Sequence, residues 1–259
     1  MFAATKGGFF HVTGLRSGVE GVGVDYLGHS ALLLTTPSGL RVAIDPYGNP
    51  SGSEPRWFIR PCPRVACDIL LITHPHFDHD AVDRVAGDPT ILRGPLELRG
   101  DGVRIRGVMS RHARHFGEEF GQRNIIFLIE AAGITFCHPG DSRADLPPET
   151  RAAVGRVDVL IVPVDESQHL LTYAEADQFI SRLAPKVAIP VHYLIPGLTD
   201  PASSLQGIDG WLRIQSNVRR LDAGHVDLSQ ADLPVEGNIW SFGTHTAGAT
   251  PDRSSGRPG

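Results

Sequence analysis

Four candidate ligands for divalent metals stand close together in the segment Thr73–Asp80. This segment reads Thr-His-Pro-His-Phe-Asp-His-Asp, which places His74, His76, Asp78 and His79 within six residues. Imidazole and carboxylate groups are ligands that Zn²⁺ and neighbouring transition metals prefer. On an extended backbone, side chains two residues apart point to the same side, so His74 and His76 can converge on one ion. Asp78 and His79 follow where the chain turns and can reach a second ion beside the first.

A surface loop that is rich in histidine by accident is the alternative interpretation. The pattern H-x-H-x-D-H would arise by chance in only about two chains per thousand of this composition, which favours a metal site. Its position favours one too, because it follows Asp68–Thr73, a continuous apolar run typical of a strand buried on both faces. In layered α/β folds, functional sites gather in the loops at the carboxyl ends of strands.

The elements that must position this motif are short strands with helices between some of them. Turn residues separate the apolar runs, and no break in composition divides the chain, so we expect one α/β domain over residues 1–242. The expected strands are Val22–Tyr26, Ala31–Thr35, Leu40–Asp45, Asp68–Thr73, Val103–Val108, Asn124–Ala131, Ile134–His138, Val157–Val164 and Lys186–Val191.

The clearest helix is expected over Tyr173–Leu183. Thr172 can cap its first free N–H groups while Glu175 reaches back, which is the pattern of a capping box. A second helix is expected over Ser203–Ile214. Residues 243–259 are rich in Gly, Pro, Ser and Thr and predict a flexible C-terminal tail.

The composition argues against several classes of protein. The 259 residues carry 24 Lys and Arg against 29 Asp and Glu, a net charge of −5, which disfavours binding to nucleic acid or to an anionic membrane. No apolar run approaches the roughly 18 residues of a transmembrane helix. The first residues, Met1–Gly8, lack the apolar stretch of a secretory signal, and the three cysteines lack the spacing of a disulfide framework. We therefore expect a cytoplasmic protein that acts on a small molecule.

The chain resembles the metallo-β-lactamase superfamily. Its H-x-H-x-D-H signature is matched at Thr73–Asp80, and further landmarks follow in the family's order between about Val22 and Leu228. The resemblance implies an αββα sandwich, in which two packed β-sheets are flanked by helices. The first landmarks are Val24–Ala31 and Val42–Tyr47. They resemble the branch that contains L-ascorbate-6-phosphate lactonase and the phospholipase D that hydrolyses N-acyl phosphatidylethanolamine. The later landmarks are Ser110–His112, Phe136–Ser142 and Ile189–Tyr193.

The resemblance also implies a binuclear metal site. Two divalent ions are expected, with Zn²⁺ as the first choice and Mn²⁺ or Fe²⁺ as alternatives, because such ligands accept all three. Seven ligands shared by two ions leave positions open for water, as a catalytic site requires. Asp78 and Asp141 are the two carboxylates expected to take part in catalysis. The ligands would be His74, His76 and His112 for the first ion, Asp78, His79 and His192 for the second, and Asp141 as the bridge.

The later ligands have alternative interpretations. His115 lies three residues after His112 and could bind in its place, although the Ser-Arg-His match favours His112. His192 could be a satisfied buried histidine, and Asp141 could cap a turn. Strand alternation is expected to point His138 away from the metals.

Four further residues are candidates to support a ligand or to contact the substrate: His29, Asp45, His169 and Tyr193. His29 could hydrogen-bond a ligand or be a core histidine, and Asp45 could orient a ligand histidine or be a turn aspartate. His169 lies in a loop that could shape substrate choice or simply be solvated.

The reaction expected from these residues is hydrolysis. Two ions that share a carboxylate would lower the pKa of a water toward neutrality, so that hydroxide attacks an acyl carbon or a phosphorus. The resemblance favours a small ester or lactone over a phosphodiester. Iron-dependent oxygen-reducing relatives carry a carboxylate where His76 stands, so this residue favours hydrolysis. The alternative of another class is a non-catalytic metal-binding or sensor domain, which the complete ligand set disfavours.

Overall fold

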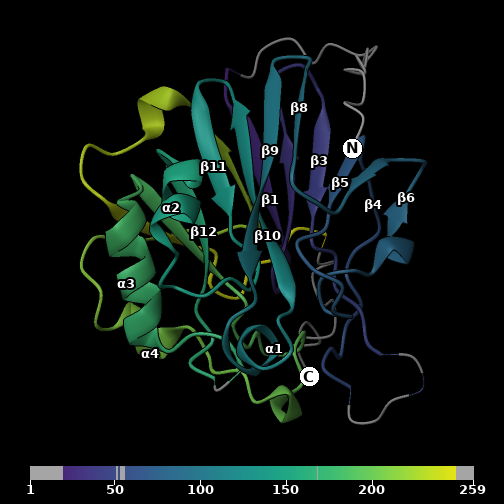
Figure 1. Cartoon of the computed structure of the whole chain (residues 1–259), viewed down its shortest axis with the longest axis vertical. Coiled ribbons are helices and arrows are strands. Elements are labelled where there is room, and N and C mark those ends of the chain that lie inside the picture. Colours follow the sequence, from purple (N-terminus) through teal and green to yellow (C-terminus); the bar gives the residue numbers. More distant parts are fainter. Residues whose placement is uncertain (1–19, 51, 53–55, 168, 249–259) are drawn as a thin grey trace, which may run out of the picture.

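The computed structural model describes residues 20–50, 52, 56–167 and 169–248. Residues 1–19 and 249–259 lie outside the described part, and with them Met1–Gly8 and most of the expected tail. In the described part, most strands belong to two large sheets that stand face to face (Figure 1). A separate pair consists of β4 (Val65–Ala66) and β6 (Val85–Ala86).

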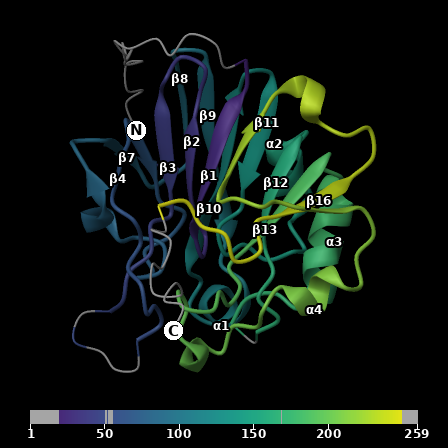
Figure 2. The ribbon, with the colours of Figure 1, turned by 180° about the vertical axis from the view of Figure 1, so that it is seen from behind.

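The first sheet has six strands and contains the N-terminal strands of the described chain. Its order is β15-β1-β2-β3-β5-β7, so a strand from near the C-terminus, β15, covers the edge of β1. Seen from the opposite side, β1, β2 and β3 face the viewer (Figure 2). The bounds are β1 (Val22–Gly28), β2 (Ala31–Thr35), β3 (Arg41–Ile44), β5 (Ile69–Leu71), β7 (Thr90–Leu92) and β15 (His225–Leu228).

The second sheet has eight strands in the order β14-β16-β13-β12-β11-β10-β9-β8. It is antiparallel from β8 to β11 and parallel from β11 through β12 and β13 to β16. The bounds are β8 (Leu96–Gly100), β9 (Val103–Arg111), β10 (Arg123–Ala131), β11 (Ile134–His138), β12 (Val159–Pro163), β13 (Val187–Val191), β14 (Val218–Arg220) and β16 (Asn238–Ser241).

The helices are short apart from α3. Helix α2 packs against β9 and α3 packs against β12, and Figure 1 shows both beside the second sheet. None of the described helices is long and apolar enough to cross a membrane. The bounds are α1 (Arg114–Glu118), α2 (Pro148–Val154), α3 (Tyr173–Leu183) and α4 (Asp209–Leu212), with single 3₁₀ turns at Val82–Arg84, Pro201–Ser203 and Gln230–Asp232.

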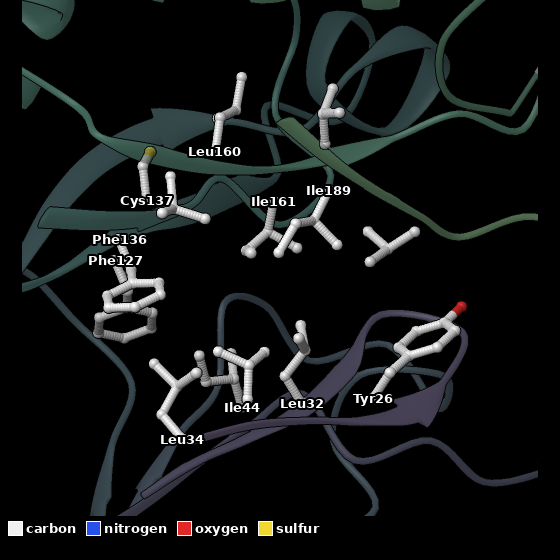
Figure 3. Close-up of a cluster of buried hydrophobic side chains, with 14 of the residues drawn as sticks. Tyr26, Leu32, Leu34, Ile44, Phe127, Phe136, Cys137, Leu160, Ile161 and Ile189 are labelled. Carbon is white, nitrogen blue, oxygen red and sulfur yellow. The ribbon is translucent and has the colours of Figure 1, made fainter. Parts of the chain in front are cut away.

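The main core fills the space between the two sheets. Leu32 and Ile44 point from the first sheet toward Phe136 and Ile161 of the second (Figure 3). Leu160, the neighbour of Ile161, points to the other side of its sheet in the same view. All five residues of β12 are buried, because strand alternation directs one set of side chains to the opposite sheet and the other set toward α3.

Parallel pairing brings several strand ends to one edge of the sandwich. Strand β3 runs parallel to β5, and β11, β12 and β13 run parallel to one another. Because parallel strands end at the same side of a sheet, the loops after them meet there. This loop edge carries the residues of the motif at Thr73–Asp80.

The structure confirms the expected metallo-β-lactamase fold and most of the expected elements. Helix α3 has the expected bounds, and its capping box is formed between Thr172 and Glu175. The helix expected over Ser203–Ile214 is wrong, because only Asp209–Leu212 is α-helical. Ser204 has a left-handed φ of 63°, and Gly207 forms a β-bridge with Leu194. Both features are incompatible with a continuous helix, so the first part of this segment is irregular.

Candidate metal centre

The metal-binding motif begins directly after the buried strand β5. The Thr73 N–H donates to Oδ1 of Asp45 at 2.8 Å, and the Thr73 hydroxyl donates to Oδ2 of the same carboxylate at 2.6 Å. Asp45 follows the neighbouring parallel strand β3, so the two strand ends are joined by one side chain. This joint fixes the point at which the chain turns into His74 and the residues that follow.

His74, His76, His112 and Asp141 form the group that we term the first subsite. Their candidate donor atoms all lie within 4.8 Å of one another. Nε2 of His74 lies 3.1 Å from Nδ1 of His76, and Nε2 of His112 lies 3.4 Å from Oδ2 of Asp141. Three of the four residues are buried, and His76 is only partly so.

His29, Asp78, His79 and His192 form the group that we term the second subsite. Here too the candidate donor atoms lie within 4.8 Å of one another, and all four residues are buried. Oδ2 of Asp78 lies 3.1 Å from Nε2 of His29, 3.6 Å from Nε2 of His79 and 3.7 Å from Nε2 of His192.

Asp141 stands between the two subsites. Its Oδ2 faces His112, whereas its Oδ1 lies 3.3 Å from Nε2 of His79. The preceding Gly140 has a φ of 55°, and a Cβ there would lie 2.5 Å from the amide oxygen of Asn124. A glycine is therefore required, because it lets the Asp141 N–H donate to that amide oxygen at 3.1 Å.

In three of the histidines, Nδ1 points away from the cluster and has a hydrogen-bond partner, which leaves Nε2 available to a metal. The His79 Nδ1–H donates to Asp45 at 2.8 Å, the His112 Nδ1–H donates to the Ala113 carbonyl at 2.7 Å, and Nδ1 of His74 lies 3.0 Å from the Thr73 hydroxyl. Such a partner selects the tautomer that presents a lone pair at Nε2. This is the arrangement that metal-binding histidines require.

The residues fit a pair of ions by two further observations. Two donors at about 2.1 Å from one tetrahedral ion lie about 3.4 Å apart, and the separations given above run from 3.1 to 3.7 Å. Buried inward-facing atoms also have no hydrogen-bond partner in the described part of the chain, namely Nε2 of His79, His112 and His192 and Oδ1 of Asp141. An unpaired buried polar atom costs about 1–3 kcal/mol, and two cations, one in each subsite, would satisfy all four.

The charges of the cluster favour a bound cation as well. Burial opposes ionisation of Asp141, but the charges of His79 and His192 outweigh it and hold the pKa of this carboxyl well below its usual range. Burial would lower the pKa of His79, but Asp141 and Asp78 raise it well above its usual value. Because histidine must be neutral to bind a metal, metal uptake at such a site displaces protons and weakens in acid.

A pocket of about 390 Å³ lies over both subsites. Its floor includes His76, His112, Asp141 and His192, and its walls are mainly apolar. Trp57 and Phe77 meet edge to face at 5.4 Å on one wall, and the ring of Phe116, from α1, lies 4.7 Å from that of His76. The residues that line it are Trp57, Pro75, His76, Phe77, Asp78, His112, Phe116, Asp141, His169, Leu170 and His192.

The remaining candidate residues fall in different places. His115 pairs with Glu119 at the surface, outside both subsites, and His138 also lies outside them. His169 lines the pocket rim, with Nε2 3.0 Å from the Ser204 hydroxyl. Tyr193 does not reach the pocket, because its hydroxyl donates to the Gly243 carbonyl at 2.7 Å.

Sequence reasoning gave too little weight to two residues of the site. His29 lies inside the second subsite, whereas the sequence predicted a residue that hydrogen-bonds a ligand or a core histidine. Asp165 lies behind His192, with Oδ2 3.9 Å from its Nδ1. Its position directly after the buried strand β12 was the signal that could have identified it.

Comparisons with known proteins identify the family of the chain. The family description "Beta-lactamase superfamily domain" matches residues 23–192. A UPF0173 metal-dependent hydrolase of Koribacter versatilis is 26% identical over 219 residues, which are 73% of this chain and 91% of that protein. One of Archaeoglobus fulgidus is 28% identical over 201 residues, 66% of this chain and 82% of that protein.

A solved structure from Thermotoga maritima is similar over most of its length. It is described as a candidate Zn-dependent hydrolase of the metallo-β-lactamase superfamily. It is 26% identical, covers 85% of this chain and 97% of its own, and has a TM-score of 0.66. The family match includes strands of both sheets and ends at His192, the last residue of the two subsites. The chain therefore belongs to the metallo-β-lactamase superfamily, as a metal-dependent hydrolase.

Proposed function

We propose that this hydrolase opens a small, uncharged lactone or ester at a site that holds two divalent ions. His74, His76 and His112 would hold one ion, Asp78, His79 and His192 the other, and Asp141 would lie between them. When bound, such ions, with Zn²⁺ as the first choice and Mn²⁺ or Fe²⁺ as alternatives, supply hydroxide at neutral pH and polarise the acyl oxygen. One water is consumed, the acyl C–O bond breaks, and the leaving oxygen takes a proton.

The single observation that carries the choice of substrate is the lining of the pocket. Trp57, Phe77, Phe116 and Leu170 form apolar walls beside the candidate ligands. Among the described residues that line the pocket there is no lysine or arginine. A substrate with a free phosphate or carboxylate would have no side chain of opposite charge there, whereas an apolar acyl or aryl group would bury its surface against the rings.

The cations of an adjoining pocket support the same choice. Arg114, Arg143 and Arg182 line a separate polar pocket that shares only Leu170 with the first. Arg114 is paired with Glu175, Arg143 is paired with Asp145, and Arg182 donates to a backbone carbonyl. These guanidinium groups are therefore occupied, which leaves little charge for a phosphodiester.

The alternative, a metal-binding sensor without turnover, is disfavoured because the pocket gives a small molecule access to the candidate metal ligands. The candidate ligands His76, Asp78, His112, Asp141 and His192 all contribute to the pocket, so a ligand in the pocket reaches the metal side of the cluster. A domain that kept the metals but lost catalysis would need no such opening.

The test compares a neutral lactone carrying an apolar tail with a chromogenic phosphodiester, each with and without chelator. We expect chelator-sensitive lactone opening to dominate. Dominant phosphodiester cleavage would replace the proposal with a phosphodiesterase, and no turnover by protein that carries two metals per chain would favour the sensor.

A variant sharpens the assignment of the apolar wall. Trp57→Ala should raise KM for the tailed lactone about tenfold, since an aromatic contact contributes about 1–1.5 kcal/mol. The matched control is His115→Ala, which removes a ring outside the pocket and should leave KM unchanged. An equal rise in both variants would contradict the pocket as the binding site.

A further inference from the structure

His29 occupies the turn between β1 and β2, yet its side chain is fully buried. Its Nε2 lies 3.1 Å from Oδ2 of Asp78, and its ring centroid lies 4.0 Å from that of His192. The rings of Phe58 and Tyr47 enclose the other side, at 5.0 Å and 6.1 Å. The imidazole is thus held between an apolar cage and the second subsite.

A comparison with His138 separates this residue from an ordinary core histidine. Nε2–H of His138 donates to the Ser30 carbonyl at 3.0 Å, and its Nδ1 accepts from the Gly140 N–H at 3.2 Å. Both of its nitrogens are satisfied by backbone. The imidazole of His29 has no backbone partner in the described chain: its Nδ1 has no hydrogen-bond partner, and its Nε2 is directed at a candidate ligand. Stability of the core alone does not explain such a side chain.

The backbone of His29 is also in a conformation that is unfavourable for a non-glycine residue. Its φ is 53°, in the left-handed region that non-glycine residues adopt rarely. The surroundings fix it there, because its carbonyl accepts from the His192 N–H at 2.9 Å and from the Tyr26 hydroxyl at 3.0 Å. Strained residues that are held so firmly gather at functional sites.

We infer that His29 is itself a ligand of the second ion, through Nε2, in addition to Asp78, His79 and His192. The inference rests on the proposed two-ion function. The separation of 3.1 Å from Asp78 equals that between His74 and His76 in the first subsite, where both atoms are candidate ligands of one ion. A histidine that only positioned Asp78 would not need to belong to a group whose donors all lie within 4.8 Å.

This assignment makes the two ions unequal. The second would have five protein donors if Asp141 is shared, and the first would have four. The first ion therefore keeps more open positions for water and substrate. The second subsite becomes suited to a metal of higher coordination number, such as Mn²⁺ or Fe²⁺, rather than to tetrahedral Zn²⁺.

The test is titration of the stripped full-length protein with Co²⁺, followed by metal stoichiometry and visible absorption. The variant is His29→Asn, because asparagine tolerates the left-handed backbone. We expect two Co²⁺ per wild-type chain. In the variant, Co²⁺ binding at the first subsite should stay unchanged, and binding at the second subsite should weaken about 100-fold or more. Its absorption bands should also intensify as the coordination number falls. The matched control, His138→Gln, also loses a buried imidazole and should leave both steps as in wild type.

Three outcomes would overturn the inference. Two Co²⁺ affinities that are both unchanged in His29→Asn would show that the residue has no role in metal binding. A weaker second step with an unchanged spectrum would reduce His29 to a positioning residue for Asp78. One Co²⁺ per wild-type chain would overturn the two-ion function itself. A measurement on the unaltered protein, scalar coupling between NMR-active cadmium and Nε2 of His29, decides the question even if the variant does not fold.

Discussion

The two subsites differ in how the protein surrounds them. In the first, His76 is only partly buried, and its Nε2 lies 3.0 Å from the side-chain oxygen of Gln122. In the second, every residue is buried, and the carboxylate of Asp45 lies behind His79 at 2.8 Å. The difference shows that the first subsite is the more accessible of the two, although Asp78 and His192 of the second also line the pocket. A substitution that disturbs the buried second subsite should therefore reduce function more than one that disturbs only the first.

The largest effect is expected from Asp141→Asn, which acts on both subsites. Its two oxygens face His112 on one side and His79 on the other, so the substitution removes the shared negative charge. We expect kcat to fall by about 10³-fold or more, and both metals to bind more weakly. Steady-state kinetics and metal analysis measure this. Asp145→Asn, at the surface beside Arg143, is the control, and normal turnover in Asp141→Asn would refute the two-ion site.

The next effect is expected from Asp45→Asn, which removes the charge behind the second subsite. Outer partners of ligand histidines contribute about 10- to 100-fold in metal affinity. Because Asp45 contacts His79 directly and reaches His74 only through Thr73, metal binding at the second subsite should weaken more than at the first. Stepwise metal titration measures both. Asp158→Asn is the control, since that buried carboxylate accepts from the Thr135 N–H far from the site.

A smaller effect is expected from Gln122→Ala, which removes the partner of His76. Because His76 lines the pocket, water can replace Gln122 as its partner. Metal binding at the first subsite should therefore weaken about tenfold or less. Metal binding at the second subsite should not change. Equal weakening of both steps would mean that the subsites are not separable as described.

The smallest effect is expected from His225→Asn. Its Nδ1 lies 2.8 Å from Asp25, the same distance as in the buried pair of His79 and Asp45, but it is exposed. Burial would lower the pKa of His225, yet the hydrogen bond and charge of Asp25 raise it. The pair therefore stabilises the fold below about pH 6.5, and this contribution is lost as the pH rises through the raised pKa.

The expected cost of His225→Asn is within about 0.5 kcal/mol at acidic pH and near zero at alkaline pH. Urea unfolding at about pH 5.5 and about pH 8.5 measures the difference. A cost that grows toward alkaline pH would contradict the sign of the shift.

Much of the candidate site could be predicted because its residues follow apolar strands. The motif after β5, His112 after β9, Asp141 after β11 and His192 after β13 each stand at a strand end that the sequence marks clearly. His29 could not be placed in the same way, because it lies in a turn of the first hairpin. Only the three-dimensional approach of that turn to His192 brings it to the cluster.

The errors in the fold have a similar cause. Strands β14 and β15 are short and mostly exposed, so they carry little apolar periodicity. The segment Ser203–Ile214 has apolar residues at helical spacing, but Gly207 and the hydrogen bond from the Gln206 N–H to the Asp165 carbonyl hold much of it in irregular structure. Tertiary contacts decide such weak segments, and a sequence does not display them.

The pairing of β1 with β15 has a consequence for synthesis on the ribosome. Asp25 lies opposite His225, so the edge of the first sheet is completed only after 200 further residues have been made. At about 5–20 residues per second, the apolar edge of β1 stays without its partner for roughly 10 to 40 s. During that interval the nascent chain presents an open strand edge to other chains, so aggregation during expression should depend on temperature and chaperones more than on the stability of the finished protein.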